Sequence, residues 1–167
     1  MAENSLAERV GQALCEAGHT VAVAESSSGG LVSSLLTDVA GASAYFDRGV
    51  VTYSNASKVE LLGVDPATLE RHGAVAGQTA CEMAHGVRDL AGTTWGVSTT
   101  GVAGPGGGTS EKPVGTVYVA VARADGSGAS APLVDAERYE FDGPRTACKR
   151  QFARQALTDL LAAVESR

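Results

Sequence analysis

Long apolar runs, paired cysteines and an excess of basic residues are all missing from this 167-residue chain. No uninterrupted apolar stretch approaches the roughly 18 residues that a membrane-spanning helix needs, and the N-terminus has no apolar segment of the signal-peptide kind. The net charge is -6 at pH 7, which argues against a broad nucleic-acid-binding face because such faces gather Lys and Arg. We therefore expect a cytoplasmic protein with a small-molecule partner, and neither nucleic acid nor membrane.

Recognisable metal-ligand patterns are absent as well. The three cysteines, Cys15, Cys81 and Cys148, are far apart and follow no C-x-x-C spacing, which predicts free thiols in a reducing compartment. The sequence contains no H-E-x-x-H motif and no Cys/His cluster. The expectation is a protein that uses no metal and no other cofactor.

Aromatic residues make up only 5% of the chain, whereas glycine occurs 21 times. A core of Ala, Val and Leu with closely approaching elements is the natural consequence. The length and the hydrophobic fraction of 44% fit one globular domain over residues 1–167. Many of the glycines fall in two clusters, each directly after a predicted strand, where α/β proteins keep their binding sites.

Helices and strands are predicted to alternate along the chain. Apolar residues at helical spacing predict helices over 6–17, 29–39, 58–62, 79–90 and 145–164, with a further helix starting at Asp65-Pro66. Apolar and β-branched runs predict strands over 20–24, 48–53, 95–100, 116–123 and 133–141. The predicted fold is a three-layer α/β/α sandwich, with a mixed, mostly parallel sheet that ends in an antiparallel hairpin.

The first glycine cluster belongs to the stretch AESSSGG, residues 24–30. A helix N-terminus there would offer free N–H groups to an oxyanion or a phosphate. Ser28 would serve as the N-cap, and Gly29 and Gly30 would let a ligand approach the backbone. A purely structural cap is an equally good interpretation, because strand–Ser–Gly–helix connections are common. Neither G-x-S-x-G nor a P-loop is present.

A serine nucleophile needs a base, and the three histidines of the chain are poorly placed for that role. A lysine can replace histidine when burial lowers its pKa. Lys58 follows VVTYSNAS, just beyond the second predicted strand. If the strands run parallel, Lys58 and Tyr53 emerge at the same end of the sheet as Ser26. Most lysines are solvated surface residues, which is the alternative for Lys58.

The second glycine cluster, GVAGPGGG at 101–108, does not fit G-x-G-x-x-G and precedes a strand rather than a helix. It is either a flexible surface loop or a backbone that lines a ligand pocket. Four cations, Lys112, Arg145, Lys149 and Arg150, are candidates to pair with a ligand anion, although a solvated helix start explains the last three equally well.

Taken together, four segments resemble the CinA C-terminal domain family, which includes stand-alone nicotinamide mononucleotide (NMN) deamidases. They are AESSSGG, GASAYFDRGVVTYSNASKVELLGV, GVSTTGVAGPGGGTSEKPVGTVYVAVA and the arginine-bearing start of the last helix. The segments lie in the family's order and spacing from about Thr20 to Gln151. One departure is that this chain has Ser27 and Ser28 where the common family form ESCTGG has Cys and Thr. Longer members carry a further N-terminal domain, for which we expect no room here.

The resemblance implies hydrolysis of the NMN carboxamide to nicotinic acid mononucleotide and ammonia, within pyridine nucleotide recycling. It implies a metal-independent Ser–Lys dyad, with Ser26 as nucleophile, Lys58 as base and Tyr53 relaying or orienting the proton. It also implies a homo-oligomer. The substrate-binding residues expected are Ser27, Ser28, Gly29, Gly30, Thr100, Gly101, Ala103, Gly104, Arg145 and Arg150. The alternatives are a non-catalytic nucleotide-binding or regulatory domain, and an amidase for another small carboxamide.

Overall fold

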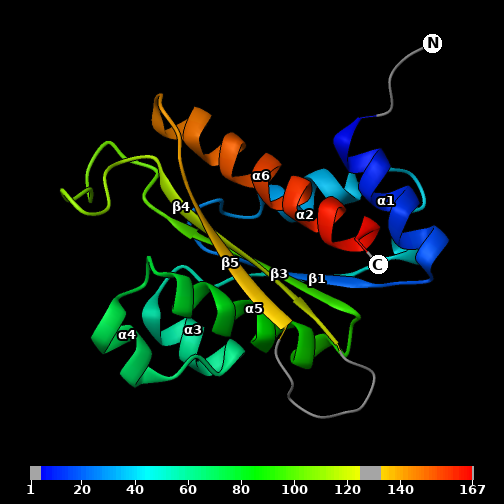
Figure 1. Ribbon diagram of the computed structural model, residues 1–167, viewed down its shortest axis with the longest axis horizontal. Helices are drawn as coiled ribbons and strands as arrows, with labels where there is room; N and C mark the ends of the chain where they lie inside the picture. The colour runs from blue at the N-terminus through cyan, green and yellow to red at the C-terminus, as the bar shows by residue number, and fades with distance from the viewer. Residues whose placement is uncertain (1–4, 125–132, 167) are drawn as a thin grey trace.

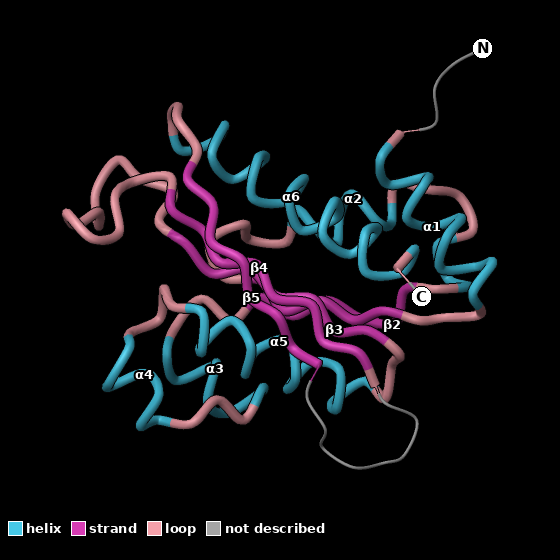
Figure 2. The backbone as a smooth tube through the Cα atoms, in the orientation of Figure 1, coloured by secondary structure: helices cyan, strands magenta, loops and turns pink. Residues whose placement is uncertain are grey.

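The computed structural model describes residues 5–124 and 133–166, which form one five-stranded sheet with helices on both faces (Figures 1 and 2). The strand order is β2-β1-β3-β4-β5. The strands are β1 (Val21–Glu25), β2 (Phe46–Val51), β3 (Trp95–Gly101), β4 (Thr116–Arg123) and β5 (Leu133–Glu140). β1 pairs in parallel with both β2 and β3, whereas β4 is antiparallel to β3 and to β5. Four strands therefore run in one direction and β4 runs against them. The sheet is mixed, as predicted, and β4–β5 is the predicted antiparallel pair.

The helices divide into two layers. They are α1 (Leu6–Ala17), α2 (Leu31–Thr37), α3 (Asn55–Leu62), α4 (Pro66–His72), α5 (Gly77–Ala91) and α6 (Arg145–Glu165), with a 3-10 turn at Ala42–Ala44. α1, α2 and α6 cover one face of the sheet, and α3, α4 and α5 lie on the other (Figure 1). The three-layer α/β/α prediction is confirmed. Within the described residues, no helix has both the length and the apolar character that crossing a membrane requires.

Small residues let α5 approach the sheet closely, which agrees with the low aromatic content. A Cβ built at Gly96 on β3 would collide with the carbonyl oxygen of Ala84 and the side chain of Arg88, both on α5. Around this contact the core is made of buried alanines, Ala80, Ala84, Ala120 and Ala122. The larger apolar cluster lies on the other face, under α1, α2 and α6.

Two predicted helix starts were wrong, one after the serine loop (residues 26–30) and one after β2. The predicted helix 29–39 begins only at Leu31, with Gly30 in the N-cap position and no side-chain cap. Ser28 is therefore not the N-cap, because its hydroxyl is drawn inward and bonds to the carboxylate of Glu25. The predicted helix 58–62 begins earlier, at Asn55, and Ser54 caps it by accepting from the N–H of Ser57. The turn-rich segment between β4 and β5 lies outside the described residues.

Candidate active site

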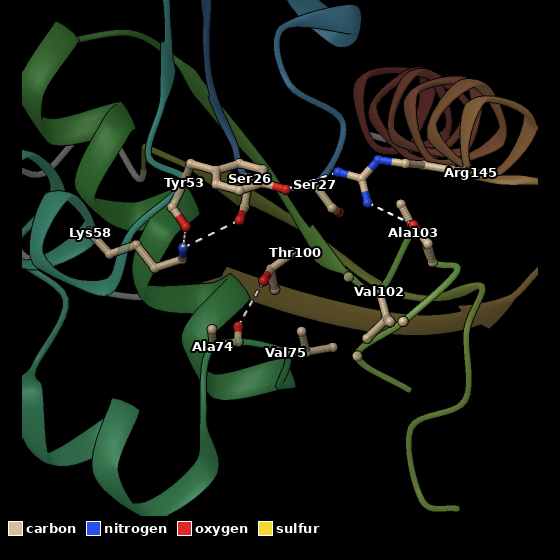
Figure 3. A pocket seen from close by; sticks show the side chains of 14 residues that line it. Ser26, Ser27, Tyr53, Lys58, Ala74, Val75, Thr100, Val102, Ala103 and Arg145 are labelled. Atoms are coloured by element: carbon tan, nitrogen blue, oxygen red, sulfur yellow. Dashed lines mark hydrogen bonds between the residues drawn. The ribbon is translucent and has the colours of Figure 1, made fainter. Parts of the chain in front are cut away.

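A pocket of about 290 Å³ opens at the carboxyl ends of β1 and β3 (Figure 3), the edge at which parallel α/β sheets bind ligands. The serine loop, the connection from β2 to α3, the segment before α5, the second glycine loop and the start of α6 all contribute to it. Its lining residues are Ser26, Ser27, Tyr53, Lys58, Ala74, Val75, Thr100, Gly101, Val102, Ala103, Gly104, Gly106, Gly107 and Arg145.

Lys58 is fully buried, with 0% of its surface exposed, and its amine faces Ser26. Nζ lies 3.3 Å from Ser26 Oγ, 2.7 Å from the carbonyl oxygen of Thr52 and 3.5 Å from that of Tyr53. Burial lowers the pKa of the Lys58 amine below its ordinary value of 10.5, because desolvation disfavours the ammonium form.

The carbonyl oxygens of Thr52 and Tyr53 orient the lone pair of the neutral Lys58 amine. A neutral amine has two N–H donors and one lone pair. When the oxygens of Thr52 and Tyr53 accept the two N–H groups, the lone pair is left for the hydroxyl of Ser26. In the ammonium form, Nζ instead donates to all three oxygens. The arrangement can therefore accept a proton from Ser26 and return one.

Local structure brings Lys58 to this position. The N–H of Thr52 donates to the carbonyl of Glu25 at 2.8 Å, which extends the parallel contact one residue beyond β2. The chain then turns at Ser54 into α3, and Lys58 falls in the first turn of that helix. The Lys58 side chain reaches back to the end of β1. Ser26 and Lys58, which are 32 residues apart in sequence, therefore meet at one edge of the sheet.

The serine loop folds back on itself and leaves backbone donors unused. Ser26 donates its N–H to the carbonyl of Thr99 at 3.1 Å, and Gly29 donates to the carbonyl of Ser26 at 3.0 Å. Among the residues that the structure describes, the N–H groups of Ser27 and Ser28 donate to no acceptor. Two adjacent free N–H groups beside a serine hydroxyl are the components of an oxyanion hole.

The hydroxyl of Tyr53 does not lie where a proton relay between Ser26 and Lys58 would need it. Its side chain is 62% exposed, and its hydroxyl accepts a hydrogen bond from Nη2 of Arg145 at 3.0 Å. Only the backbone carbonyl of Tyr53 is near the Lys58 amine. Nη1 of Arg145 donates to the carbonyl of Gly104 at 2.7 Å. The Tyr53 hydroxyl therefore belongs to the Arg145 side of the pocket (Figure 3).

Arg145 supplies the positive charge at that side. It is the first residue of α6, a helix of 21 residues whose N-cap, Pro144, provides no side-chain cap. The guanidinium uses two of its five N–H donors on Tyr53 and Gly104, which leaves three for a ligand. Together with the positive end of the helix dipole, this group favours an anion.

Four of the expected binding residues do not line the pocket. The side chain of Ser28 is fully buried and bonds to Glu25, and Arg150 lies exposed on α6. Gly29 and Gly30 face away from the pocket lining: a Cβ at Gly29 would meet the Lys149 amine, and one at Gly30 would meet Val51. Lys112 also lies outside the lining, with its amine on the carbonyl of His72 at 3.1 Å.

Two residues of the pocket wall could not be predicted from the sequence. Ala74 and Val75 are small apolar residues in the connection between α4 and α5. The hydroxyl of Thr100 donates to the carbonyl of Ala74 at 2.7 Å, which fixes this wall against β3. Among the described residues, no group of three or more His, Cys, Asp or Glu side chains is arranged to hold a metal ion.

The fold and the pocket define a class: α/β/α proteins that hold a serine hydroxyl against a buried amine in a small-molecule pocket at the carboxyl ends of parallel strands. Within this class the chain belongs to the CinA family, because the sequence model described as the CinA C-terminal domain matches residues 3–164.

Relatives of two lengths support this membership. The chain is 48% identical over 155 residues to the nicotinamide-nucleotide amidohydrolase PncC of Escherichia coli K12, covering 93% of this chain and 90% of PncC. It is 54% identical over 159 residues to a CinA-like protein of Chlorobaculum tepidum, covering 95% of this chain and 37% of that protein. The chain therefore spans little more than a third of the longer relative.

A solved structure agrees with the fold. The competence/damage inducible protein CihA of Agrobacterium tumefaciens superposes with a TM-score of 0.88 at 38% identity, covering 99% of this chain and 100% of that one.

Proposed function

We propose that this chain is an amidohydrolase that converts NMN and water to nicotinic acid mononucleotide and ammonia by a Ser–Lys mechanism. The observation that carries the proposal is the fully buried amine of Lys58, 3.3 Å from the hydroxyl of Ser26. The name of the Escherichia coli relative, an amidohydrolase of nicotinamide nucleotide that this chain matches over 90% of its length, supports the substrate.

In the first half of the reaction, Ser26 Oγ attacks the carboxamide carbon while its proton moves to the neutral Lys58 amine. The carbonyl oxygen becomes an oxyanion, which the N–H groups of Ser27 and Ser28 stabilise. The C–N bond then breaks, and the Lys58 ammonium gives its proton to the departing NH₂ group. Ammonia leaves, and the acyl group remains on Ser26 as an ester.

The second half repeats these steps with water. Lys58, neutral again, takes a proton from a water molecule that attacks the ester carbon. The bond to Ser26 Oγ breaks, and Lys58 returns the proton to the serine oxygen. Nicotinic acid mononucleotide leaves after its carboxyl group gives its proton to water, and the lysine and serine regain their starting states.

Arg145 is the proposed partner of the 5′-phosphate, because its three free N–H donors and the start of α6 lie at the pocket side away from Lys58. The backbone of Gly101, Ala103 and Gly104 borders the space between the two ends. Since the Tyr53 hydroxyl bonds to Arg145, its proposed role is to hold this cation rather than to relay the serine proton. Following the family resemblance, we further propose that the protein works in the cytoplasm as a homo-oligomer.

Ammonia release from NMN, nicotinamide and NAD by the purified protein tests the proposal, with Ser26→Ala as the control. Release from NMN in excess of the other two is the expected result. Release only from another carboxamide would make the protein an amidase of different specificity. Binding of NMN without release from any amide would favour a nucleotide-binding regulatory domain and would contradict the enzyme.

A further inference from the structure

A buried carboxylate immediately precedes the serine loop and has no part in the chemistry above. Glu25 is the last residue of β1 and is 0% exposed. The three ion pairs found among the described residues do not involve it. A buried charge without a cation is costly unless hydrogen bonds satisfy it.

Four donors satisfy the Glu25 carboxylate, two at each oxygen. Oε1 accepts from the hydroxyl of Ser28 at 2.7 Å and from the N–H of Val32 at 2.9 Å. Oε2 accepts from the N–H and the hydroxyl of Ser33, at 3.0 and 2.9 Å. Val32 and Ser33 are in the first turn of α2, whose N-cap residue, Gly30, has no side chain to offer. Glu25 therefore caps α2 from outside the helix.

The hydrogen bonds continue from Glu25 into the neighbouring strand. The Ser28 hydroxyl gives its single proton to Glu25, so at its 2.7 Å contact with the Thr99 hydroxyl it must be the acceptor. Thr99 on β3 therefore donates to Ser28, and Ser28 donates to Glu25. The backbone of the same threonine also accepts from the N–H of Ser26. The loop is thus fixed to β3 at two points and to α2 through Glu25.

This network ends at the groups that carry the proposed reaction. Ser26 directly follows Glu25, and Ser27 and Ser28 supply the free N–H groups. Glu25 itself does not line the pocket, and both of its oxygens are already engaged. It can neither touch a ligand there nor act as a base on Ser26.

We infer that Glu25 is a positioning residue: its carboxylate holds the loop 26–30 so that the Ser26 hydroxyl faces Lys58 and the free N–H groups of Ser27 and Ser28 keep their place next to that hydroxyl. The inference rests on the proposed Ser–Lys function. Glu25 then affects kcat through the position of the loop. A residue that only capped and stabilised α2 would not affect kcat.

Glu25→Gln tests the inference because it keeps the shape and removes acceptors. An amide has one oxygen and an NH₂ group, so in either orientation one backbone N–H, that of Val32 or that of Ser33, would face another donor, and the four hydrogen bonds cannot all be kept. We expect kcat for ammonia release from NMN to fall by about 10²- to 10³-fold, the loss typical of a misplaced oxyanion donor. KM should change little, since Glu25 lies outside the pocket.

The matched control is Ser98→Ala, which removes a different buried hydroxyl in the sheet, one that bonds the carbonyl of Ala80 at 2.6 Å and lies outside the pocket. Rates are divided by the folded fraction, measured from the fluorescence of Trp95, the one tryptophan of the chain, which is 4% exposed. Ser98→Ala should lose stability but keep its kcat. A normal kcat per folded molecule in Glu25→Gln would overturn the inference.

If Glu25→Gln does not fold, two variants that each remove one hydrogen bond to Glu25 test the same inference. Ser33→Ala and Ser28→Ala each remove one hydroxyl donor and leave the carboxylate in place. Each should lower kcat by less than Glu25→Gln does, with Ser28→Ala the more affected because it also breaks the link to Thr99. Wild-type kcat in both would overturn the inference.

A substrate-free readout separates this inference from the choice of substrate. Phenylmethylsulfonyl fluoride sulfonylates an activated serine: the Ser Oγ–S bond forms, fluoride leaves, and the serine proton passes to the base. Intact mass gives the rate of labelling at Ser26. If the wild type releases no ammonia but is labelled much faster than Glu25→Gln, the proposed substrate is wrong and the positioning role stands. Equal labelling rates in the two proteins would overturn the positioning role.

Discussion

Replacing Lys58 with methionine probes the proposed base, because methionine is of similar length and cannot accept a proton. The other titratable side chains that line the pocket are those of Tyr53 and Arg145. The guanidinium of Arg145 offers only N–H donors and no acceptor, and the tyrosine hydroxyl is engaged with that arginine. Among the described residues that line the pocket, none can therefore replace the lysine as the base.

The expected loss in kcat is consequently the full contribution of a general base, about 10²- to 10⁴-fold. This range corresponds to about 2.7–5.4 kcal/mol of barrier height, at about 1.36 kcal/mol for each factor of ten. The fold should survive. Removing a buried amine relieves its desolvation, whereas the carbonyl of Thr52 loses its 2.7 Å partner, and these effects oppose each other.

The assay is ammonia release from NMN at saturating substrate, with Ser26→Ala marking the background rate. Lys112→Met is the matched control: it also removes a lysine amine from a backbone carbonyl, but outside the pocket lining. Lys112→Met should keep the wild-type kcat. A Lys58→Met rate within tenfold of wild type would refute the assignment of Lys58 as the base.

Three further predictions concern pH, the anion and packing. Since only the neutral amine accepts a proton, kcat/KM should rise with pH through the pKa of Lys58, and burial should place that rise below pH 10.5; a rate that falls over this range would contradict a lysine base. Arg145→Met should raise KM for NMN much more than it lowers kcat, as shown by steady-state kinetics, and an unchanged KM would remove Arg145 from the phosphate site. Gly96→Ala should lower the free energy of unfolding by about 1–3 kcal/mol in urea titrations, because the added Cβ collides with α5; an unchanged midpoint would contradict that contact.

The strands and most helices were predictable because their apolar patterns are local. Lys58 and Ser26 were predictable as neighbours for a related reason: each follows a parallel strand, and the carboxyl ends of parallel strands share one edge. The direction of the Tyr53 side chain was not predictable. Its ring is largely exposed, and its hydroxyl is held by Arg145, which is 92 residues away in sequence.

The prediction of Ser28 as the N-cap of α2 was wrong because a residue outside the helix decides the capping. Serine is a favoured N-cap, and local preference alone selects it. The structure has a stronger acceptor in Glu25, whose charge takes both the helix N–H groups and the Ser28 proton. A glutamate at the end of a buried strand is the sequence signal that would have indicated this, since such a charge needs several donors.

The decisive test of Ser26 as the nucleophile is ammonia release from NMN by the wild type and by Ser26→Ala, compared with Ser98→Ala. We expect steady release by the wild type and by Ser98→Ala, and release no faster than the uncatalysed reaction by Ser26→Ala. Release by Ser26→Ala at the wild-type rate would contradict the assignment of Ser26 as the nucleophile.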